Sequence, residues 1–422
     1  MDIPYTKHVL DNGLTLIVHE DHKAPIVAVN IWYHVDSKNE KPGKTGFAHL
    51  FEHLMFQGSV NVPDTRHIEL IERAGGSMNG STWFDRTNYF ETLPSHHLEL
   101  ALWLESDRMG WMLPAITQEK LDNQRDVVKN EKRQRYDNQP YGDWDQRLQA
   151  LVFPEDHPYH HPVIGSMEDL DAATLDDVEA FFRTYYVPNN AVLTVAGDFV
   201  PEAALAMIER WFGDIPVGRP IPPVPGRIDI PATLGHTARE RVVEDVPLPR
   251  VFVACRVPPY TDASFYPAEV AGSILGSGRA SRLYRTLVRE RRVAKDAAAF
   301  VFPLVSGAAM LLVRATGYAH VTVETLERAV LEQLDALEDA SGKEVERAVA
   351  VTETRLVRTL ERVGERADLL SMFTTFFDDP ERLNGEMDRI RAVTPGEIRA
   401  FAGSRLGADN RAVLSYVPRS EA

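Results

Sequence analysis

The chain has 422 residues, of which 44% are hydrophobic and 26% are charged, a composition typical of a soluble globular protein with about two to four domains. Its 62 acidic and 46 basic residues give a net charge of −16, which argues against nucleic acid or an anionic membrane as the main partner. No apolar run approaches the roughly 18–20 residues that span a bilayer, and the single cysteine, Cys255, excludes an intrachain disulfide and a cysteine-rich zinc site.

The first predicted elements are strands. Residues 6–10 and 14–18 flank an Asn12-Gly13 pair, which favours a tight hairpin turn between two apolar runs. Another strand is predicted over residues 26–35. Apolar residues at helical spacing then predict helices over residues 46–57, 64–74, 95–112, 117–136, 174–185 and 201–212, with a strand at 191–196. We also interpret Cys255 as a buried strand residue, because it ends an apolar run.

A proline-rich stretch at residues 216–231 interrupts this pattern, and such a stretch favours an extended connector. We therefore expect an N-terminal domain over residues 1–215, a linker over 216–231 and a C-terminal domain over 232–422.

The pattern then repeats. The segment beginning at Thr174 is similar to the one beginning at Thr394, and in each copy an asparagine, Asn190 or Asn410, stands 16 residues further on and opens an apolar strand. The two copies share an offset of 394 − 174 = 220 residues. This offset predicts an internal duplication of one α+β unit, each an antiparallel-rich sheet packed with helices. The alternative is a chance similarity between two amphipathic helices.

The strongest chemical signal is His49-Leu-Phe-Glu52-His53 within the helix predicted over 46–57. We expect Thr45 to cap this helix. Two histidines one turn apart can place ring nitrogens about 2.0–2.1 Å from one zinc ion, and the intervening carboxylate then lies beside metal-bound water, as a general base requires. The alternative is a solvated polar helix face. The opposite face of the predicted helix carries an apolar stripe, which consists of Phe47, Leu50, Phe51, Leu54 and Met55.

This motif, followed by an acidic helix, resembles the pitrilysin/insulinase family of zinc peptidases, in the half-size subfamily that includes the mitochondrial processing peptidase and bacterial relatives. The resemblance implies two domains in a clamshell and zinc-dependent peptide hydrolysis. It implies that Glu131 is the third ligand of one zinc ion per chain, 131 − 53 = 78 residues after His53, and that Glu52 is the catalytic base. The family commonly has a glutamate where this chain has Gln124, so a charged outer-shell role at that position is in doubt.

The family resemblance also assigns a substrate-binding role to residues near the zinc. In relatives, the segment equivalent to residues 75–82 is an edge strand to which the substrate backbone pairs. It implies that Asn79, Gly80 and Ser81 bind peptide substrate, of the short or unfolded kind that an enclosed chamber would favour. An ordinary hairpin loop is the alternative.

The second copy lacks the zinc motif, because the 220-residue offset places Glu269, Gly272 and Ser273 at the motif positions. In the family this half supplies an arginine and a tyrosine that reach the substrate, whereas this chain has Val288 and Lys295 there. Arg289 is the alternative for the arginine if the register shifts by one residue, but no tyrosine follows it at the right distance. We therefore expect a heterodimer with a related subunit that lacks the zinc motif and supplies this pair; a homodimer is the alternative.

Three further expectations complete the sequence-based interpretation. The cluster His157-Pro-Tyr159-His160-His161 lacks helical spacing, so we expect a surface loop. The rival functions are a non-catalytic scaffold of the same fold and a purely structural zinc site, although structural sites usually contain cysteine. The chain opens without a charged segment followed by an apolar one, and bacterial relatives are often exported, so we expect a periplasmic location with the leader removed; the cytoplasm is the alternative.

Overall fold

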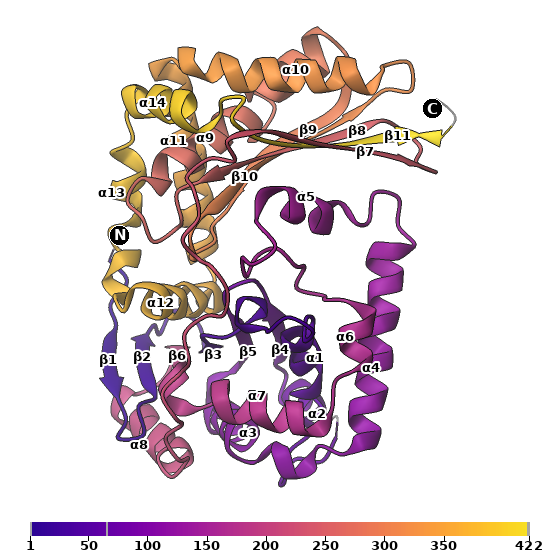
Figure 1. The fold of residues 1–422 in the computed structure, drawn as a ribbon. Coiled ribbons are helices and arrows are strands. Elements are labelled where there is room, and N and C mark those ends of the chain that lie inside the picture. The colour runs from indigo at the N-terminus through magenta and orange to yellow at the C-terminus, as the bar shows by residue number, and fades with distance from the viewer. Residues whose placement is uncertain (1, 65, 420–422) are drawn as a thin grey trace. The chain divides into compact units, whose positions relative to one another are not determined.

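The computed structural model describes residues 2–64 and 66–419, and the chain divides into two compact units that are not continuous in sequence (Figure 1). Unit 1 consists of Met1–Lys132, Pro162–Pro225 and Arg358–Gly385. Unit 2 consists of Arg133–His161, Gly226–Val357 and Glu386–Ala422. The chain passes from unit 1 to unit 2 between Pro225 and Gly226, within the stretch predicted as a linker. The compact units differ from the predicted contiguous domains because residues 133–161 and 358–385 each belong to the unit formed mainly by the other half of the chain.

Unit 1 is built on a six-stranded sheet in the order β1-β2-β6-β3-β5-β4, in which only β2 and β6 are parallel neighbours. The predicted hairpin is confirmed, with Gly13 at φ +87°, which glycine adopts without strain. Strand β4 forms one edge of the sheet. The strands are β1 (Thr6–Val9), β2 (Thr15–Glu20), β3 (Ile26–Tyr33), β4 (Ser77–Thr82), β5 (Thr87–Pro94) and β6 (Ala191–Gly197).

Helices cover both faces of this sheet. Successive side chains of β5 alternate between faces: Asn88 bonds Asp368 on α12, and the Tyr89 ring lies beneath Arg108 on α3. Helix α12, from the C-terminal half of the chain, therefore covers the face opposite α3 (Figure 1). The helices of unit 1 are α1 (Phe47–Leu54), α2 (Arg66–Arg73), α3 (Leu98–Trp111), α4 (Gln118–Lys132), α6 (Met167–Asp171), α7 (Leu175–Tyr185), α8 (Pro201–Phe212) and α12 (Val363–Phe377).

Unit 2 repeats this arrangement with five strands in the order β7-β11-β8-β10-β9, again with one parallel pair, β7 and β11. Cys255 is buried in β8, as predicted. The strands are β7 (His236–Glu244), β8 (Arg250–Val257), β9 (Ala294–Phe302), β10 (Ala309–Gly317) and β11 (Asn410–Pro418). The helices are α5 (Trp144–Val152), α9 (Phe265–Gly276), α10 (Val323–Asp335), α11 (Gly342–Leu360, whose last residues belong to unit 1), α13 (Glu386–Arg391) and α14 (Pro395–Arg405).

The predicted duplication is confirmed down to individual hydrogen bonds. Thr174 and Thr394 each form a capping box at the start of the equivalent helices α7 and α14. The side-chain amides of Asn190 and Asn410 then bond the carbonyls of residues 185 and 405, at 2.8 and 2.6 Å. The fold is therefore α+β with two similar units, as expected from the sequence.

Residues 157–161 form a loop, as predicted, but its predicted surface position is wrong, because the segment is anchored in the core of unit 2. His157 and Tyr159 are buried, and the Tyr159 hydroxyl accepts hydrogen bonds from the Val305 and Ser306 amides at 3.2 and 2.8 Å. Burial, followed by the charge of Arg256, lowers the pKa of His157 to about 4. The aromatic contacts of the segment, and not its polarity, determine its position.

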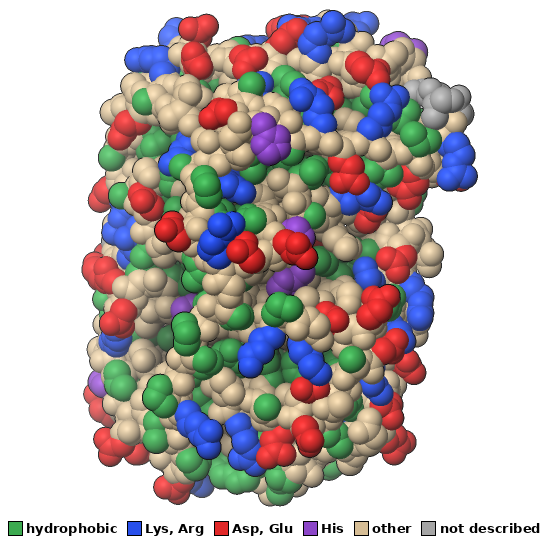
Figure 2. All heavy atoms as spheres, in the orientation of Figure 1, with side chains coloured by type: hydrophobic (Ala, Val, Ile, Leu, Met, Phe, Trp, Pro, Cys, Tyr) green, Lys and Arg blue, Asp and Glu red, His purple; other side chains and the backbone are tan. Residues whose placement is uncertain are grey.

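Among the described residues, no helix combines the length and apolar character that a membrane crossing requires. On the face drawn in Figure 2, acidic and basic side chains are interspersed.

Candidate metal centre

Helix α1 is fixed by an apolar face and by an acidic cap. The predicted stripe is confirmed, since all five of its side chains are buried. The Glu40 carboxylate accepts hydrogen bonds from the Gly46 and Ala48 amides at 3.0 and 2.7 Å, which satisfies the first turn of the helix. The predicted cap by Thr45 is wrong: Gly46 occupies that position at φ +79°, and the Thr45 hydroxyl instead donates to Asp169.

Opposite this apolar face, α1 presents His49 and His53 to Glu131 on α4. The three residues have ligand atoms that all lie within 4.8 Å of one another. Glu131 Oε2 lies 3.9 Å from His49 Nε2 and 3.4 Å from His53 Nε2. The side chain of His49 is 12% exposed, that of His53 is 23% exposed and that of Glu131 is 18% exposed. The cluster is therefore mostly buried but accessible to solvent.

This donor set fits a zinc ion. Two ligands at about 2.0–2.1 Å from a tetrahedral zinc lie about 3.4 Å apart, and the separations of 3.4 and 3.9 Å are close to that value. Two imidazole nitrogens and one carboxylate oxygen match the three-ligand sets of hydrolytic zinc sites, which leave one position for water. The structure thus brings together the three residues predicted as ligands.

Glu131 reaches the cluster because one face of α4 packs into unit 1. Leu121, Gln124 and Val128 on this face are buried, and α4 packs against α1. Gln124 lies two turns before Glu131 on the same face, at 7% exposure. Burying a neutral amide at that position costs less free energy than burying a carboxylate, because the carboxylate would need a compensating partner.

Glu52 points from α1 toward the edge strand β4. The Thr82 hydroxyl donates to Glu52 Oε2 at 2.7 Å. Burial raises the pKa of Glu52, and the hydrogen bond from Thr82 opposes this rise. Thr82 was not predicted from the sequence, although strand alternation places it on the same face as Gly80 and was the signal that could have found it.

The predicted substrate-binding residues lie on β4, which pairs with β5 on one side and with no other strand among the described residues. Asn79 Oδ1 accepts from the Gly80 amide at 2.9 Å, and a Cβ atom on Gly80 would lie 3.2 Å from Glu52 Oε1. Arg86 donates to the Ser81 carbonyl at 2.8 Å and thereby holds the strand from within. No spacing signal in the sequence identifies Arg86.

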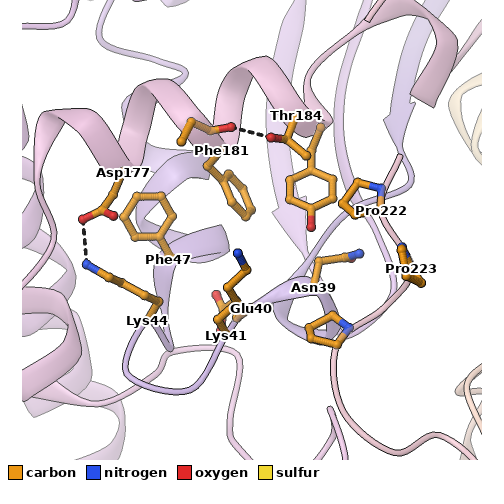
Figure 3. A pocket seen from close by; sticks show the side chains of 13 residues that line it. Asn39, Glu40, Lys41, Lys44, Phe47, Asp177, Phe181, Thr184, Pro222 and Pro223 are labelled. Atoms are coloured by element: carbon orange, nitrogen blue, oxygen red, sulfur yellow. Dashed lines mark hydrogen bonds and ion pairs between the residues drawn. The ribbon is translucent and has the colours of Figure 1, made fainter. Parts of the chain in front are cut away.

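A separate pocket of about 260 Å³ lies beside the start of α1 in unit 1 (Figure 3). It contains none of the predicted site residues. Phe47 is the only lining residue from α1, and Lys44 and Asp177 form an ion pair of 2.7 Å at its wall. Prolines from the predicted linker complete it. The lining residues are Asn39, Glu40, Lys41, Lys44, Phe47, Asp177, Ala180, Phe181, Thr184, Tyr185, Pro222, Pro223 and Pro225.

Comparison with known sequences identifies the class of protein. The family profile "Insulinase (Peptidase family M16)" matches residues 15–153, and "Peptidase M16 inactive domain" matches residues 172–351. A zinc protease, PqqE, from Helicobacter pylori is 30% identical over 368 residues, which cover 86% of this chain and 78% of that protein. The chain belongs to the M16 family of peptidases, as the sequence motif indicated.

Solved structures share the whole fold. The crystal structure of a protease from H. pylori superimposes with a TM-score of 0.92 at 25% identity, covering 98% of this chain and 99% of that one. The structure described as the peptidase M16 inactive domain from Pseudomonas fluorescens gives a TM-score of 0.85 at 17% identity, covering 98% of both chains. The relatives named zinc proteases point to a peptidase function for this chain.

Proposed function

We propose that this protein is a zinc-dependent endopeptidase that hydrolyses short or unfolded peptides. The observation that carries the proposal is the convergence of His49, His53 and Glu131 beside a general base. Their ligand atoms lie within 4.8 Å of one another, and Glu52 on the same helix is oriented by Thr82.

In this mechanism, His49, His53 and Glu131 hold one zinc ion. Bound there, the ion would supply Lewis-acid chemistry, which polarises a carbonyl and lowers the pKa of water. Glu52 takes the proton of the attacking water at its carboxylate and returns it to the leaving amine. Burial favours the neutral form of Glu52, and the bond from Thr82 favours the ionised form that accepts a proton.

The substrate is an extended peptide, because the strand beside Glu52 is a sheet edge. Backbone groups of such a strand bind another strand through main-chain hydrogen bonds with little regard for side chains. Asn79 Oδ1 now bonds the Gly80 amide, and a substrate carbonyl would replace it there. Asn79, Gly80 and Ser81 thus align the peptide along β4.

Replacing Glu52 by glutamine tests the proposal, because glutamine keeps the shape and loses the base. We expect peptide hydrolysis to fall about 10²–10⁴-fold with zinc content unchanged. Glu269→Gln, in the equivalent helix of unit 2, is the matched control and should retain activity. Equal hydrolysis by the Glu52→Gln and unaltered proteins would overturn the mechanism.

We further propose that the active form is a heterodimer. Residues 172–351 match the inactive domain of the family, and the arginine and tyrosine positions hold Val288 and Lys295. A related subunit without the zinc motif would supply that pair, and an anion-stabilising donor is worth about 10²–10³ in rate. Mixing the chain with such a subunit should raise kcat by this factor; an equal rate for the chain alone contradicts the heterodimer.

The second candidate is a non-catalytic scaffold, favoured only by the inactive-domain match over residues 172–351. It predicts no hydrolysis by the zinc-loaded chain, alone or mixed with its subunit. The periplasmic location remains a prediction, which cell fractionation with an antibody against the chain would check.

A further inference from the structure

Behind the sheet edge, unit 1 contains a buried ionic cluster that the proposed mechanism does not use. Arg108 on α3 is 2% exposed, and its Nη2 donates to the carboxylate of Glu105, one turn earlier and fully buried. A buried arginine requires such a partner, since an isolated buried charge is strongly unfavourable.

Two further titratable groups complete the cluster. Glu91 on β5 and His67 on α2 are both buried, and His67 Nε2 lies 3.4 Å from Glu91 Oε1 and 4.0 Å from Glu105 Oε1. Burial, and then the charge and hydrogen bond of Glu105, raise the pKa of Glu91 well above its ordinary value. Burial, and then the charge of Arg108, lower the pKa of His67. Burial and the neighbouring Glu105 thus favour the neutral form of Glu91, and Glu105 is the acidic partner that Arg108 contacts.

The other side of the Arg108 guanidinium faces aromatic rings. Its central carbon lies 4.1 Å from the ring centroid of Tyr89 and 5.3 Å from that of Phe56. Among the described residues, Arg108 Nε and Nη1 have no hydrogen-bond acceptor, so ring faces take the place of oxygen atoms. A desolvated guanidinium over a ring face holds that ring in place by cation–π attraction.

These two rings pack against two of the predicted site residues, Gly80 and Glu52. Tyr89 and Phe56 contact each other edge to face, with centroids 5.7 Å apart. A Cβ atom on Gly80 would lie 3.1 Å from Tyr89 Cδ1, and 3.2 Å from both Phe56 Cε2 and Glu52 Oε1. Glycine at position 80 thus lets β4 approach Glu52 as closely as the rings allow, and a shift of either ring moves this contact.

We propose that Arg108 is a positioning residue of the peptidase site: anchored by Glu105, its guanidinium holds Tyr89 and Phe56 against Gly80 and Glu52. This inference rests on the proposed function. The cluster has the composition of a metal site, since His67, Glu91 and Glu105 offer ligand atoms within 4.8 Å. However, Arg108 already supplies the positive charge there, so we assign it no metal.

The test removes both members of the ion pair together, because Arg108→Met alone would strand the Glu105 charge in the core. The double variant Arg108→Met/Glu105→Gln should fold and bind one zinc per chain, with KM within about twofold of the unaltered protein. Its kcat should fall about 10- to 100-fold, since small displacements of catalytic groups have effects of this size. Arg108→Lys, which keeps the charge but not the planar group, should give an intermediate kcat.

The matched control is Arg282→Met/Glu344→Gln, which removes a partly buried arginine–glutamate pair from unit 2. The proposal is overturned if the Arg108 double variant keeps its kcat, if its lower kcat follows zinc loss, or if the control loses kcat equally. A second bound zinc that Glu91→Gln removes would also overturn it. Failure of the proposed function is seen separately, as hydrolysis that survives Glu52→Gln.

Discussion

The equivalent helices α1 and α9 show how one architecture supports two different surfaces. In unit 1, α1 turns His49, Glu52 and His53 toward the edge strand β4 and toward α4. In unit 2, α9 lies directly against the corresponding edge strand, β9: a Cβ atom on Gly276 would lie 1.8 Å from the Ala299 amide nitrogen. The 220-residue offset aligns Gly276 with Phe56 and Gly272 with Glu52. A Cβ atom on Gly272 would lie 3.4 Å from Val301 Cγ2 and 3.7 Å from Phe300 Cα, so α9 packs closely against β9 along this face.

This difference shows that the shared fold alone does not make a site. Helix α9 carries Glu269, Gly272 and Ser273 at the aligned positions, and glycine and serine offer no strong metal ligand there. Burial, followed by the charge of Glu386, raises the pKa of Glu269 to about 7, while Arg355 acts in the opposite direction. Glu269 thus stands at the position of His49, and its burial favours the protonated, neutral form of the carboxyl group.

The largest expected effect is on metal binding. Glu131→Gln should weaken zinc affinity by more than the 10–100-fold that outer-shell substitutions typically cost, because it removes one of three ligands. Calorimetric titration with zinc measures the loss. Glu269→Gln, the control on α9, should leave the zinc affinity unchanged. Equal affinities for the unaltered protein and the two variants would contradict the assignment of Glu131 as a ligand.

The second prediction concerns pH and unit 2. Because the folded pKa of Glu269, about 7, exceeds its ordinary value of 4.5, its stabilising contribution is present below pH 4.5 and is lost as the pH rises through 7. The loss is at most about 3 kcal/mol. Glu269→Gln removes this dependence and should protect the amides of α9 more strongly than the native sequence at pH 8, but equally at pH 4. Hydrogen exchange measures both.

Glu52→Gln is the control for this experiment, since it alters a carboxyl group in the equivalent helix of unit 1. It should leave the exchange of α9 amides unchanged at both pH values. Protection of α9 that falls with rising pH in the Glu269→Gln protein as well would contradict the assignment to Glu269.

The third prediction compares two glycines at equivalent contacts. Gly276→Ala should lower the free energy of unfolding by about 1–3 kcal/mol, because its Cβ atom meets a backbone nitrogen that cannot move aside. Gly80→Ala meets only side chains, at 3.1–3.2 Å, and should mainly reduce kcat. Urea unfolding and peptide turnover, measured on both variants, separate the two effects. Loss of turnover without loss of stability in Gly276→Ala would contradict this comparison.

The sequence predicted most of the fold because its signals are local. Helical spacing and the Asn12-Gly13 turn each depend on residues within one or two turns, and the structure contains the predicted helices and the hairpin. The cap predicted at Thr45 is wrong, because Gly46 holds that position. The predicted domains are wrong for two segments: residues 133–161 belong to unit 2 and residues 358–385 to unit 1. Their position depends on contacts between residues far apart in the sequence, such as those of Tyr159 with the Ser306 amide, which no local pattern shows.

The site shows the same division. The pair His49 and His53 follows from helical spacing, and Glu131 from family resemblance. Thr82 and Arg108 escaped prediction because each acts across an element boundary, one from a strand to a helix and the other from a helix to a ring on a strand. Such contacts depend on the packing of α1, α3 and the sheet together.

The smallest predicted effect isolates the side-chain hydrogen bond between α1 and its edge strand, for which α9 has a glycine, Gly272, at the position of Glu52. Thr82→Val keeps the shape of the side chain and removes the donor to Glu52 Oε2. Losing one hydrogen bond to a charged group costs about 1.5–3 kcal/mol when the acceptor is fully buried, and the partial exposure of this site reduces the expected loss of kcat to about tenfold. Steady-state kinetics should show this fall with KM unchanged. Thr316→Val, which removes a hydroxyl that contacts Arg250 on the sheet of unit 2, should leave kcat unaltered. An unchanged kcat for Thr82→Val would mean that the packing of Gly80 alone, without this hydrogen bond, orients Glu52.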